Sequence, residues 1–293
     1  MNNSQFKKKI IIGTAQFGMN YGIANISGKP NQQQVDSILN YAWNNNINGL
    51  DTAKGYGGSE VVIGRYLRGN SNQIWDIITK INENPQKTIS QIRESTKNLS
   101  IHPNTILAHS IEMFFNDSFY NNALKLKQEG QINSIGVSLY TENEINKVII
   151  SKKYKPDIIQ IPLNILDTRL YHNDILNKLS DLNIEIHARS VFLQGLFYLD
   201  KTIIKKYFND AFSSIVKLKL IAKESNLSLP ELSLLWLLNL EKINKVIIGI
   251  DNLDQLIGHI KTTEKIVNSN VYKDALNIKY KNEKVLNPNY WNL

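Results

Sequence analysis

The sequence predicts an α/β fold: a single (β/α)8 TIM barrel with its active site at the C-terminal face of the strands. Short runs rich in Ile and Val alternate with longer amphipathic stretches along the 293 residues, of which 42% are hydrophobic. No internal repeat, low-complexity block or Pro/Gly-rich linker divides this alternation. A chain of this length can bury the core of one large domain. We therefore expect residues 1–293 to form a single domain.

The predicted strands are short, continuous apolar runs, as expected for strands buried on both faces of a parallel sheet. They cover residues 9–13, 49–52, 75–80, 105–109, 134–138, 158–161, 184–187 and 245–249.

The predicted helices lie between these runs and carry apolar residues at helical spacing. They cover residues 32–45, 59–68, 85–99, 116–129, 142–151, 171–182, a pair over 202–225 and 229–239, and 253–262. Ser59, Thr141 and Ser228 are predicted N-caps, and Pro230 suits the first turn of its helix. The polar tail from about residue 264 is expected to pack over the barrel.

A doubly wound sheet is the competing fold. Its dinucleotide-binding form carries a glycine fingerprint, GxGxxG, after the first strand. Residues 13–18 instead read GTAQFG, which does not match that fingerprint. The pattern therefore favours the barrel.

Composition narrows the function classes. The chain has no Cys, which excludes disulfides, thiolate nucleophiles and Cys-based metal sites. The net charge is +8, but Lys and Arg are spread along the chain. This spread favours a solvated basic surface over a nucleic-acid site, with attraction of anionic ligands as the alternative. No apolar run reaches the length of a signal peptide or of a membrane span. We expect a cytoplasmic protein, a monomer or weak homo-oligomer, without nucleic-acid or membrane partners.

Four polar residues follow three successive predicted strands. Asp51 ends the second strand, Tyr56 lies in the loop beyond it, Lys80 ends the third strand and His109 ends the fourth. Strand C-termini meet at one mouth of a barrel, so these side chains are expected to share a cavity. Each residue alone has an ordinary alternative as a turn, packing or surface group. The four in order favour a catalytic group.

These residue types suit the reduction of a carbonyl. A free phenol loses its proton only near pH 10, and a nearby ammonium favours the phenolate. Tyr56 is therefore the predicted proton donor, with Lys80 as its cationic neighbour and Asp51 as the anchor of Lys80. His109 is expected to hydrogen-bond the substrate oxygen or to relay a proton.

The segments LDTAKGYGGSE, ITK and LAHS resemble the three signature segments of the aldo-keto reductase family. The resemblance continues through GTAQFGMNYG, IGVS, IIQIPLN, ARSVFLQGLF and VIIGIDNLDQL, which occur in the family's order. It implies an enzyme that binds NADPH or NADH across the barrel mouth and reduces a carbonyl. The implied catalytic residues are Asp51, Tyr56, Lys80 and His109. The implied cofactor-binding residues are Ser138 and Gln160 at the nicotinamide amide, Arg189 at the nicotinamide ring, Ser190, Leu193, Gln194 and Gly195 along the pyrophosphate, and Gly249 and Asp251 near the adenosine.

Three departures from the family pattern bear on the cofactor. Leu139 follows Ser138 where the family usually has Asn, so one amide contact is expected to be missing. Arg189 replaces an aromatic residue, and its charge should disfavour the oxidised nicotinamide. Asp251 and its neighbours lack the Arg or Lys that pairs with a 2′-phosphate, which favours NADH or dual use. A helix-cap role for Asp251 is the alternative.

The substrate class stays open at this point. The side chains predicted either to border the pocket or to pack at the barrel rim are Gln16, Phe17, Tyr21, Tyr140, Tyr290 and Trp291. Their mixture suits a sugar as well as an aryl aldehyde. Two other functions remain: a catalytically slow nicotinamide-binding or sensing protein, and a barrel enzyme of another reaction class. No metal site is expected, because the five His residues lack ligand spacing such as HExxH.

Overall fold

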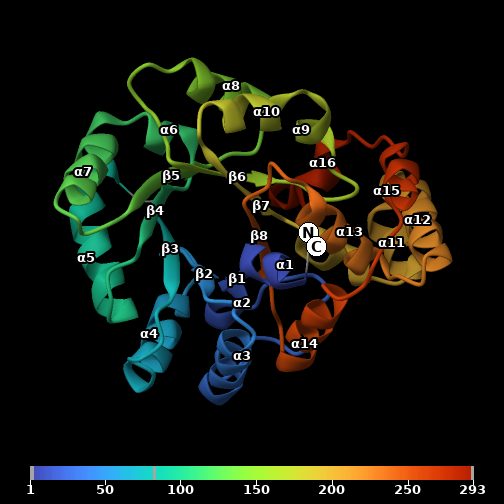
Figure 1. Ribbon diagram of the computed structural model, residues 1–293, viewed down its shortest axis with the longest axis horizontal. Helices are drawn as coiled ribbons and strands as arrows, with labels where there is room; N and C mark the ends of the chain where they lie inside the picture. The colour runs from blue at the N-terminus through green and yellow to red at the C-terminus, as the bar shows by residue number, and fades with distance from the viewer. Residues whose placement is uncertain (1–2, 82–83, 292–293) are drawn as a thin grey trace.

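The computed structural model describes residues 3–81 and 84–291. In these residues, eight parallel strands close into one barrel in sequence order, with helices around them (Figure 1). This confirms the predicted single-domain (β/α)8 fold. The strands are β1 (Ile10–Gly13), β2 (Gly49–Asp51), β3 (Asp76–Ile81), β4 (Thr105–Ala108), β5 (Ser134–Ser138), β6 (Ile158–Pro162), β7 (Glu185–Arg189) and β8 (Lys245–Gly249).

The outer layer consists of helices that follow the strands. They are α3 (Gln32–Asn44), α4 (Ser59–Gly69), α5 (Thr88–Leu99), α7 (Asp117–Gln128), α8 (Glu142–Ile150), α10 (Ile175–Asp181), α11 (Lys201–Tyr207), α12 (Asn209–Glu224), α13 (Leu229–Asn239) and α14 (Leu253–Thr262). Shorter elements cap or connect these layers: α1 (Asn3–Lys9), α2 (Ala15–Gly18), η1 (Pro85–Lys87), α6 (Ile111–Phe114), α9 (Arg169–His172), η2 (Leu193–Tyr198), α15 (Ser269–Leu276), α16 (Glu283–Leu286) and η3 (Pro288–Tyr290).

The predicted strands agree with the observed ones to within two residues at each end. Lys9, predicted as the first strand residue, ends α1 instead. Its ammonium donates to the carbonyls of Leu238 and Leu240 at the end of α13, so it serves a contact between elements. The predicted helix 171–182 is interrupted at Asp174, where the backbone is left-handed with φ 57°. Two short helices, α9 and α10, replace it.

Two of the three predicted N-caps are confirmed. Thr141 and Ser228 each accept a hydrogen bond from the third helical residue, within full capping boxes. The prediction for Ser59 is wrong, since Gly58 precedes the helix and Ser59 is its first residue. The Ser59 hydroxyl bonds to Thr14 at the end of β1 instead.

Apolar side chains fill both the space between the layers and the barrel interior. The larger core joins the outward faces of the strands to the helices. A smaller cluster consists of Ile11, Ile78, Leu107, Ile158 and Ile247. Side chains two apart on a strand share a face, so these residues point inward below the strand ends. They form the floor on which a polar site can rest.

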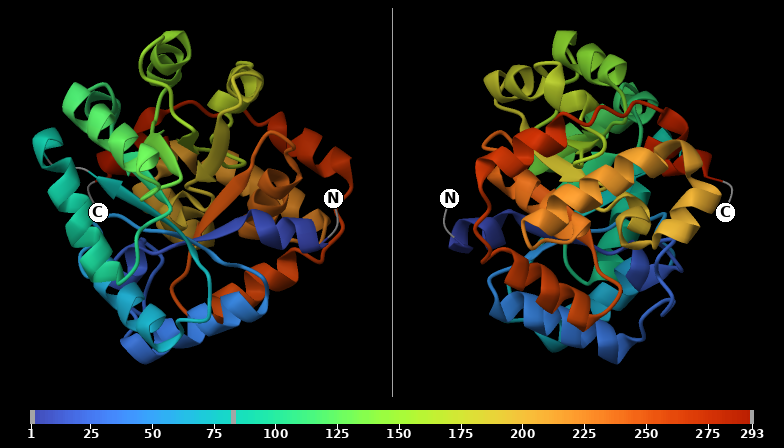
Figure 2. Two further views of the ribbon diagram at one scale, coloured as in Figure 1. Left: turned by 60° about the vertical axis from the view of Figure 1, so that its left-hand side comes forward. Right: turned by 90° about the vertical axis from the view of Figure 1, so that its right-hand side faces the viewer.

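The first and last described elements, α1 and η3, lie on opposite sides of the molecule (Figure 2, right panel). The tail between α15 and η3 is tied to other elements by polar contacts. Glu283 accepts from Arg169, and Tyr280 donates to Asp210. None of the described helices is long and apolar enough to cross a bilayer.

Two helical glycines give a matched test of the packing between α4 and α5. A Cβ on Gly64 of α4 would lie 1.9 Å from the Asn98 carbonyl oxygen, whereas one on Gly258 of α14 would meet nothing within 4 Å. We expect Gly64→Ala to lower the free energy of unfolding by about 1–3 kcal/mol, because the helices must separate. Gly258→Ala should raise it by about 0.5–1 kcal/mol, because Ala loses less entropy in a helix. Urea titrations of both variants measure these changes. Equal effects would contradict the tight α4–α5 contact.

Candidate active site

A cavity of about 300 Å³ lies at the C-terminal ends of the strands. Most of the residues predicted from the sequence line it. They are Asp51, Tyr56, Lys80, His109, Ser138, Arg189, Ser190, Gln194, Gly195, Gly249 and Asp251. Gln160 and Leu193 are not among the residues that line the cavity, and both side chains are fully buried. The barrel thus brings together groups at the C-terminal ends of six strands, namely β2, β3, β4, β5, β7 and β8.

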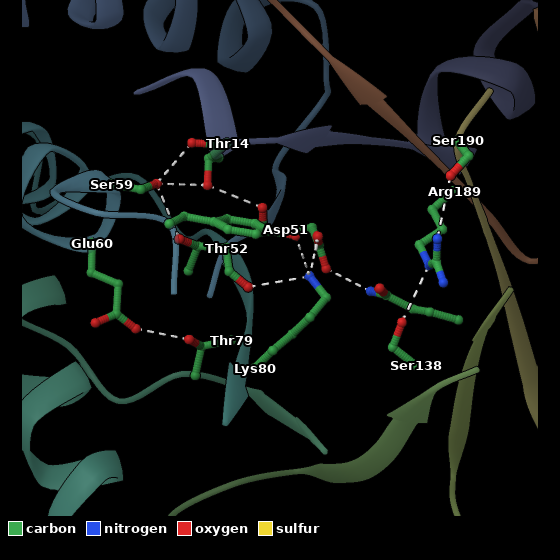
Figure 3. A network of polar contacts seen from close by, with 12 residues as sticks. Thr14, Asp51, Thr52, Ser59, Glu60, Thr79, Lys80, Ser138, Arg189 and Ser190 are labelled. Carbon is green, nitrogen blue, oxygen red and sulfur yellow. Dashed lines mark hydrogen bonds and ion pairs between the residues drawn. The ribbon is translucent and has the colours of Figure 1, made fainter. Parts of the chain in front are cut away.

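A buried ion pair joins Asp51 of β2 to Lys80 of β3. Asp51 is paired with Ile78 in the sheet, and Lys80 lies two residues further along β3, so both side chains point inward. Lys80 is 1% exposed and Asp51 is 3% exposed. The ammonium also donates to the carbonyl of Thr52 at 3.3 Å (Figure 3). These contacts compensate for the loss of water around both charges.

The phenolic oxygen of Tyr56 lies 3.4 Å from the Lys80 ammonium. Burial alone would lower the pKa of Lys80. The negative charge of Asp51 and the hydrogen bonds to Asp51 and Tyr56 outweigh burial, so the pKa of Lys80 is raised above its ordinary value. Lys80 therefore keeps a positive charge beside Tyr56 at neutral pH. That charge stabilises negative charge on the phenolic oxygen.

The loop that carries Tyr56 is held by a buried hydroxyl network (Figure 3). The hydroxyl of Ser59 donates to the carbonyl of Thr14 at 2.9 Å and accepts from the hydroxyl of Thr52 at 3.1 Å. Its backbone amide donates to the carbonyl of Tyr56 at 3.1 Å. On the other side, a Cβ on Gly18 of α2 would lie 1.7 Å from the Tyr56 carbonyl oxygen. The loop is thereby confined between β1, β2 and α2.

His109 follows β4 and is half-buried in the cavity wall. Its backbone amide donates to the Ile81 carbonyl at 3.0 Å. Burial, followed by the positive charges of Lys80 and Arg189, lowers the pKa of His109 to about 4. The imidazole is therefore neutral at physiological pH and can donate one hydrogen bond from one ring nitrogen.

Gln160 of β6 lies beneath the cavity and supports its floor. Its amide nitrogen donates to the second oxygen of the Asp51 carboxylate at 2.5 Å. Its amide oxygen is buried and has no hydrogen-bond partner among the described residues. Gln160 therefore contacts the ion pair directly and leaves one buried acceptor unpaired. Unpaired buried acceptors are rare in native structures.

Arg189 ends β7 and crosses the mouth of the cavity. It donates to the hydroxyl of Ser138 at 3.2 Å and to the carbonyl of Leu139 at 3.1 Å. Its guanidinium carbon lies 4.0 Å from the centre of the Tyr140 ring. Leu139, which departs from the family pattern, is fully buried and takes part through its backbone. A single guanidinium therefore connects the ends of β5 and β7.

The turn after β7 has an unusual backbone. Ser190, Leu193, Gln194 and Gly195 all have positive φ, between 46° and 96°. The turn is fixed from outside, since Asn164 donates to the Ser190 carbonyl at 3.0 Å. Successive left-handed residues orient backbone N–H groups into a concavity that suits anions. Leu193 contributes its backbone to this turn while its side chain packs in the core.

Asp251 follows β8 and does not cap the next helix. Asn252 takes that position and accepts from the Gln255 amide, so the cap alternative for Asp251 is wrong. The Gln255 side chain accepts from the Asp251 backbone amide at 2.7 Å and donates to the Asp251 carboxylate at 3.2 Å. Burial raises the pKa of Asp251, and hydrogen bonds from Gln255 and Gln16 oppose this rise. The Gln16 side chain also packs against Gly249, where a Cβ would lie 2.4 Å from the Gln16 amide nitrogen.

Several lining residues were not singled out from the sequence. The cavity also contains Asn25, Phe192, Tyr198, Gln255, Pro288 and Asn289. Of the side chains considered for the pocket border, Gln16, Tyr21 and Tyr140 line the cavity, whereas Phe17, Tyr290 and Trp291 do not. Phe17 is fully buried in the core. Phe192 lies within the turn after β7 and Tyr198 follows that turn, and this clustering of aromatic residues is the one signal for them in the sequence.

No group of three or more His, Asp or Glu side chains in the described residues is arranged to hold a metal ion. The charged groups of the cavity are Asp51, Lys80, Arg189 and Asp251. Their arrangement supports proton donation by a phenol next to a fixed cation.

The comparisons with known proteins identify the family and the fold. The model of the Aldo/keto reductase family matches residues 9–274. The structure resembles the holo form of an aldo-keto reductase from Bacillus halodurans, with a TM-score of 0.71, 19% identity, and 93% of this chain and 92% of that chain covered. It also resembles a Pseudomonas aeruginosa structure described as an aldo-keto reductase, with a TM-score of 0.62, 20% identity, and coverage of 87% and 89%. None of the curated proteins matches the sequence. The family match covers most of the chain, and the chain therefore belongs to the aldo/keto reductase family.

Proposed function

We propose that this protein is an oxidoreductase that transfers a hydride between NADPH or NADH and a carbonyl compound, with Tyr56 as the general acid. The observation that carries the proposal is the phenolic oxygen of Tyr56, 3.4 Å from the buried ammonium of Lys80. Lys80 is in turn paired with Asp51. Family membership supports the reaction class.

Features of the cavity fit a nicotinamide nucleotide. The Ser138 hydroxyl lies in the cavity wall on β5 and can bond to a carboxamide, and Gln160, its neighbour in the sheet, lies directly beneath with an unpaired amide oxygen. The left-handed turn from Ser190 to Gly195 suits a pyrophosphate. Gly249 and Asp251 line the cavity at the end proposed for the adenosine. When bound, a reduced nicotinamide supplies the hydride for the carbonyl carbon.

The residues of the chain then supply the proton to the carbonyl oxygen and stabilise the phenolate that is left. Tyr56 donates its phenolic proton to the carbonyl oxygen as negative charge develops on that oxygen. Lys80 stabilises the phenolate that remains, and Asp51 keeps Lys80 charged and in place. Because Asp51 and Lys80 are almost fully buried, water screens their charges weakly. The reverse reaction uses the same groups in the opposite order.

His109 acts as a neutral hydrogen-bond donor to the substrate oxygen. A pKa of about 4 leaves the imidazole uncharged at neutral pH. An imidazolium at this place would face the charges of Lys80 and Arg189, which the structure holds nearby. The neutral form orients the carbonyl without this repulsion.

Two side chains set the cofactor preference. Arg189 places a guanidinium at the mouth, and this charge disfavours the positively charged oxidised nicotinamide. Asp251 is aligned by Gln255 and suits a ribose hydroxyl better than a 2′-phosphate. We therefore expect the reduced cofactor to bind more tightly than the oxidised one. We also expect the protein to use NADH, or both NADH and NADPH, and not NADPH alone.

A small-molecule carbonyl, including a keto-sugar, is the proposed substrate. Gln16, Tyr21 and Tyr140 give the cavity both hydrogen-bonding and aromatic surface, which suits a polyhydroxylated carbonyl. A sensing protein with the same fold is the second candidate. Binding of NADH without oxidation, whichever aldehyde or ketone is offered, would favour sensing.

The first test removes the acid. We expect Tyr56→Phe to lower kcat by about 10²–10⁴-fold, because no other hydroxyl adjoins Lys80 in the cavity as described, and to leave the Kd for NADH nearly unchanged. Absorbance at the nicotinamide band, over a panel of sugars, keto-sugars and aryl aldehydes, measures kcat. Tyr207→Phe, at an exposed position of α11, is the control. If Tyr56→Phe kept most of the activity, the proposed acid would be wrong.

The second test concerns pH. NMR of the His109 ring should give a titration midpoint near the pKa of about 4. This folded value lies below the unfolded value of about 6.5, so protonation favours the unfolded chain. The free energy of unfolding should therefore decrease as pH falls from about 6.5 to about 4. In His109→Asn, the free energy of unfolding should fall less over the same pH range. A midpoint in the ordinary range would contradict a neutral donor held by burial and nearby cations.

The third test measures nucleotide selectivity by fluorescence titration with NADH, NAD⁺, NADPH and NADP⁺. The reduced forms should bind more tightly than the oxidised forms. In Arg189→Gln, the difference between the Kd values of the reduced and the oxidised forms should become smaller. Arg65→Gln, an exposed change on α4, should have no effect. Equal affinities in the unaltered protein would count against the role of Arg189. NADPH binding far more tightly than NADH would contradict the preference assigned to Asp251.

A further inference from the structure

A second cavity of about 570 Å³ adjoins the first one, and Tyr140 lines both. Its walls come from the start of α8, from α9 and from the tail between α15 and α16. Figure 1 shows α9 and α16 next to each other, with α10 between α9 and α8. Leu170 is the one apolar residue among the described residues that line this cavity. The lining combines charged and hydroxyl groups with the apolar surface of two tyrosine rings and of the lysine and arginine stems, so it suits a charged ligand with a carbon skeleton.

The walls of the second cavity are held by long-range contacts. Arg169 of α9 donates to Glu283 of the tail at 2.7 Å. Tyr280 and Asn282 both donate to Asp210 of α12, at 2.6 and 2.9 Å. The same tail continues to Pro288, which lines the first cavity. One segment of chain thus forms part of both cavities and connects them.

Of the positively charged side chains in the second cavity, one is paired with carboxylates of the described residues and two are not. Arg169 is neutralised by Asp167 and Glu283. The Lys279 ammonium contacts the His172 ring nitrogen at 2.6 Å instead of a carboxylate. Burial and the charge of Lys279 lower the pKa of His172, so this imidazole is a neutral acceptor. Lys281 has no ion-pair partner in the described part of the chain.

We propose that the second cavity binds a phosphate group of the carbonyl substrate. This inference rests on the function proposed above, and it assigns the substrate to the phosphorylated polyhydroxy aldehydes or ketones. The reacting carbonyl lies at Tyr56, and the phosphate extends past Tyr140 to Lys279 and Lys281. A phosphate monoester carries a charge near −2 and three strong acceptor oxygens, which matches two cations better than a carboxylate does.

The position of the second cavity favours the substrate over the cofactor. The residues proposed for the pyrophosphate and adenosine follow β7 and β8, whereas this cavity lies beyond β5 and β6. Glu142, which also faces the cavity, accepts from Asn173 at 2.5 Å and can accept from a sugar hydroxyl as well. The mixture of cations, a carboxylate and hydroxyl groups suits a phosphorylated polyol.

The test compares matched substrates and matched variants. KM is measured at low ionic strength for D-erythrose and D-erythrose 4-phosphate, and for D-glucose and D-glucose 6-phosphate. The double variant Lys279→Gln/Lys281→Gln is compared with Lys284→Gln, which removes an exposed charge from the same tail but lines neither cavity. We expect the double variant to raise KM for the phosphorylated compounds by about tenfold or more, to leave KM for the neutral ones unchanged, and to leave kcat unchanged. Added salt should reduce the difference.

Three outcomes would overturn the proposal. KM could rise equally for neutral and phosphorylated substrates, or Lys284→Gln could have the same effect as the double variant. Alternatively, inorganic phosphate could change the rate with neutral aldehydes while phosphorylated substrates gain nothing, which would indicate a regulatory anion site.

Calorimetric titration of D-erythrose 4-phosphate separates this proposal from the proposed function. If no carbonyl compound is reduced at all, the proposed function fails. Loss of phosphate-ester binding in the double variant would then still support the second cavity as a phosphate site. Undiminished binding in the double variant would overturn it.

Discussion

The buried pair of Lys80 and Asp51 is the constraint on which the site depends. A charge this far from water is tolerated only with close partners, because removing each ion from water costs several kcal/mol. Asp51 supplies the opposite charge, and the Thr52 carbonyl and the Tyr56 hydroxyl complete the surroundings of the ammonium. Gln160 takes the remaining carboxylate oxygen. The parallel register of β2 and β3 fixes the distance between Asp51 and Lys80. The Tyr56 phenol therefore lies next to a cation whose position the sheet determines.

The side chain of Ser59, after β2, bonds to residues at the ends of β1 and β2 and does not cap α4. Ser59 was expected to cap α4, and its hydroxyl connects Thr14 and Thr52 instead. Its backbone amide holds the carbonyl of Tyr56. Gly18 lets α2 approach this loop closely. The position of the phenol is therefore determined by three segments that pack against one another, which limits its motion relative to Lys80.

Arg189 and Tyr140 organise the mouth of the barrel. The guanidinium bonds to the hydroxyl of Ser138 and the carbonyl of Leu139, and it stacks on the ring of Tyr140. This arrangement keeps Tyr140 between the two cavities, with the cation on the side of Tyr56. The two cavities therefore meet at one tyrosine ring, and a single elongated ligand could reach both. The tail contributes residues to the walls of both cavities.

The sequence by itself determined the barrel, because buried parallel strands and amphipathic helices are written in local periodicity. It also located Asp51, Tyr56, Lys80 and His109, since strand ends of a barrel share one mouth. Only the tertiary structure decided that Gln160 bonds to a carboxylate 109 residues away and that Leu193 faces the core. Only the tertiary structure likewise shows that Tyr140 lines both cavities and that Lys279 contacts His172. These contacts join segments distant in the chain, and periodicity reports only which face of an element is buried, not which side chain it meets there.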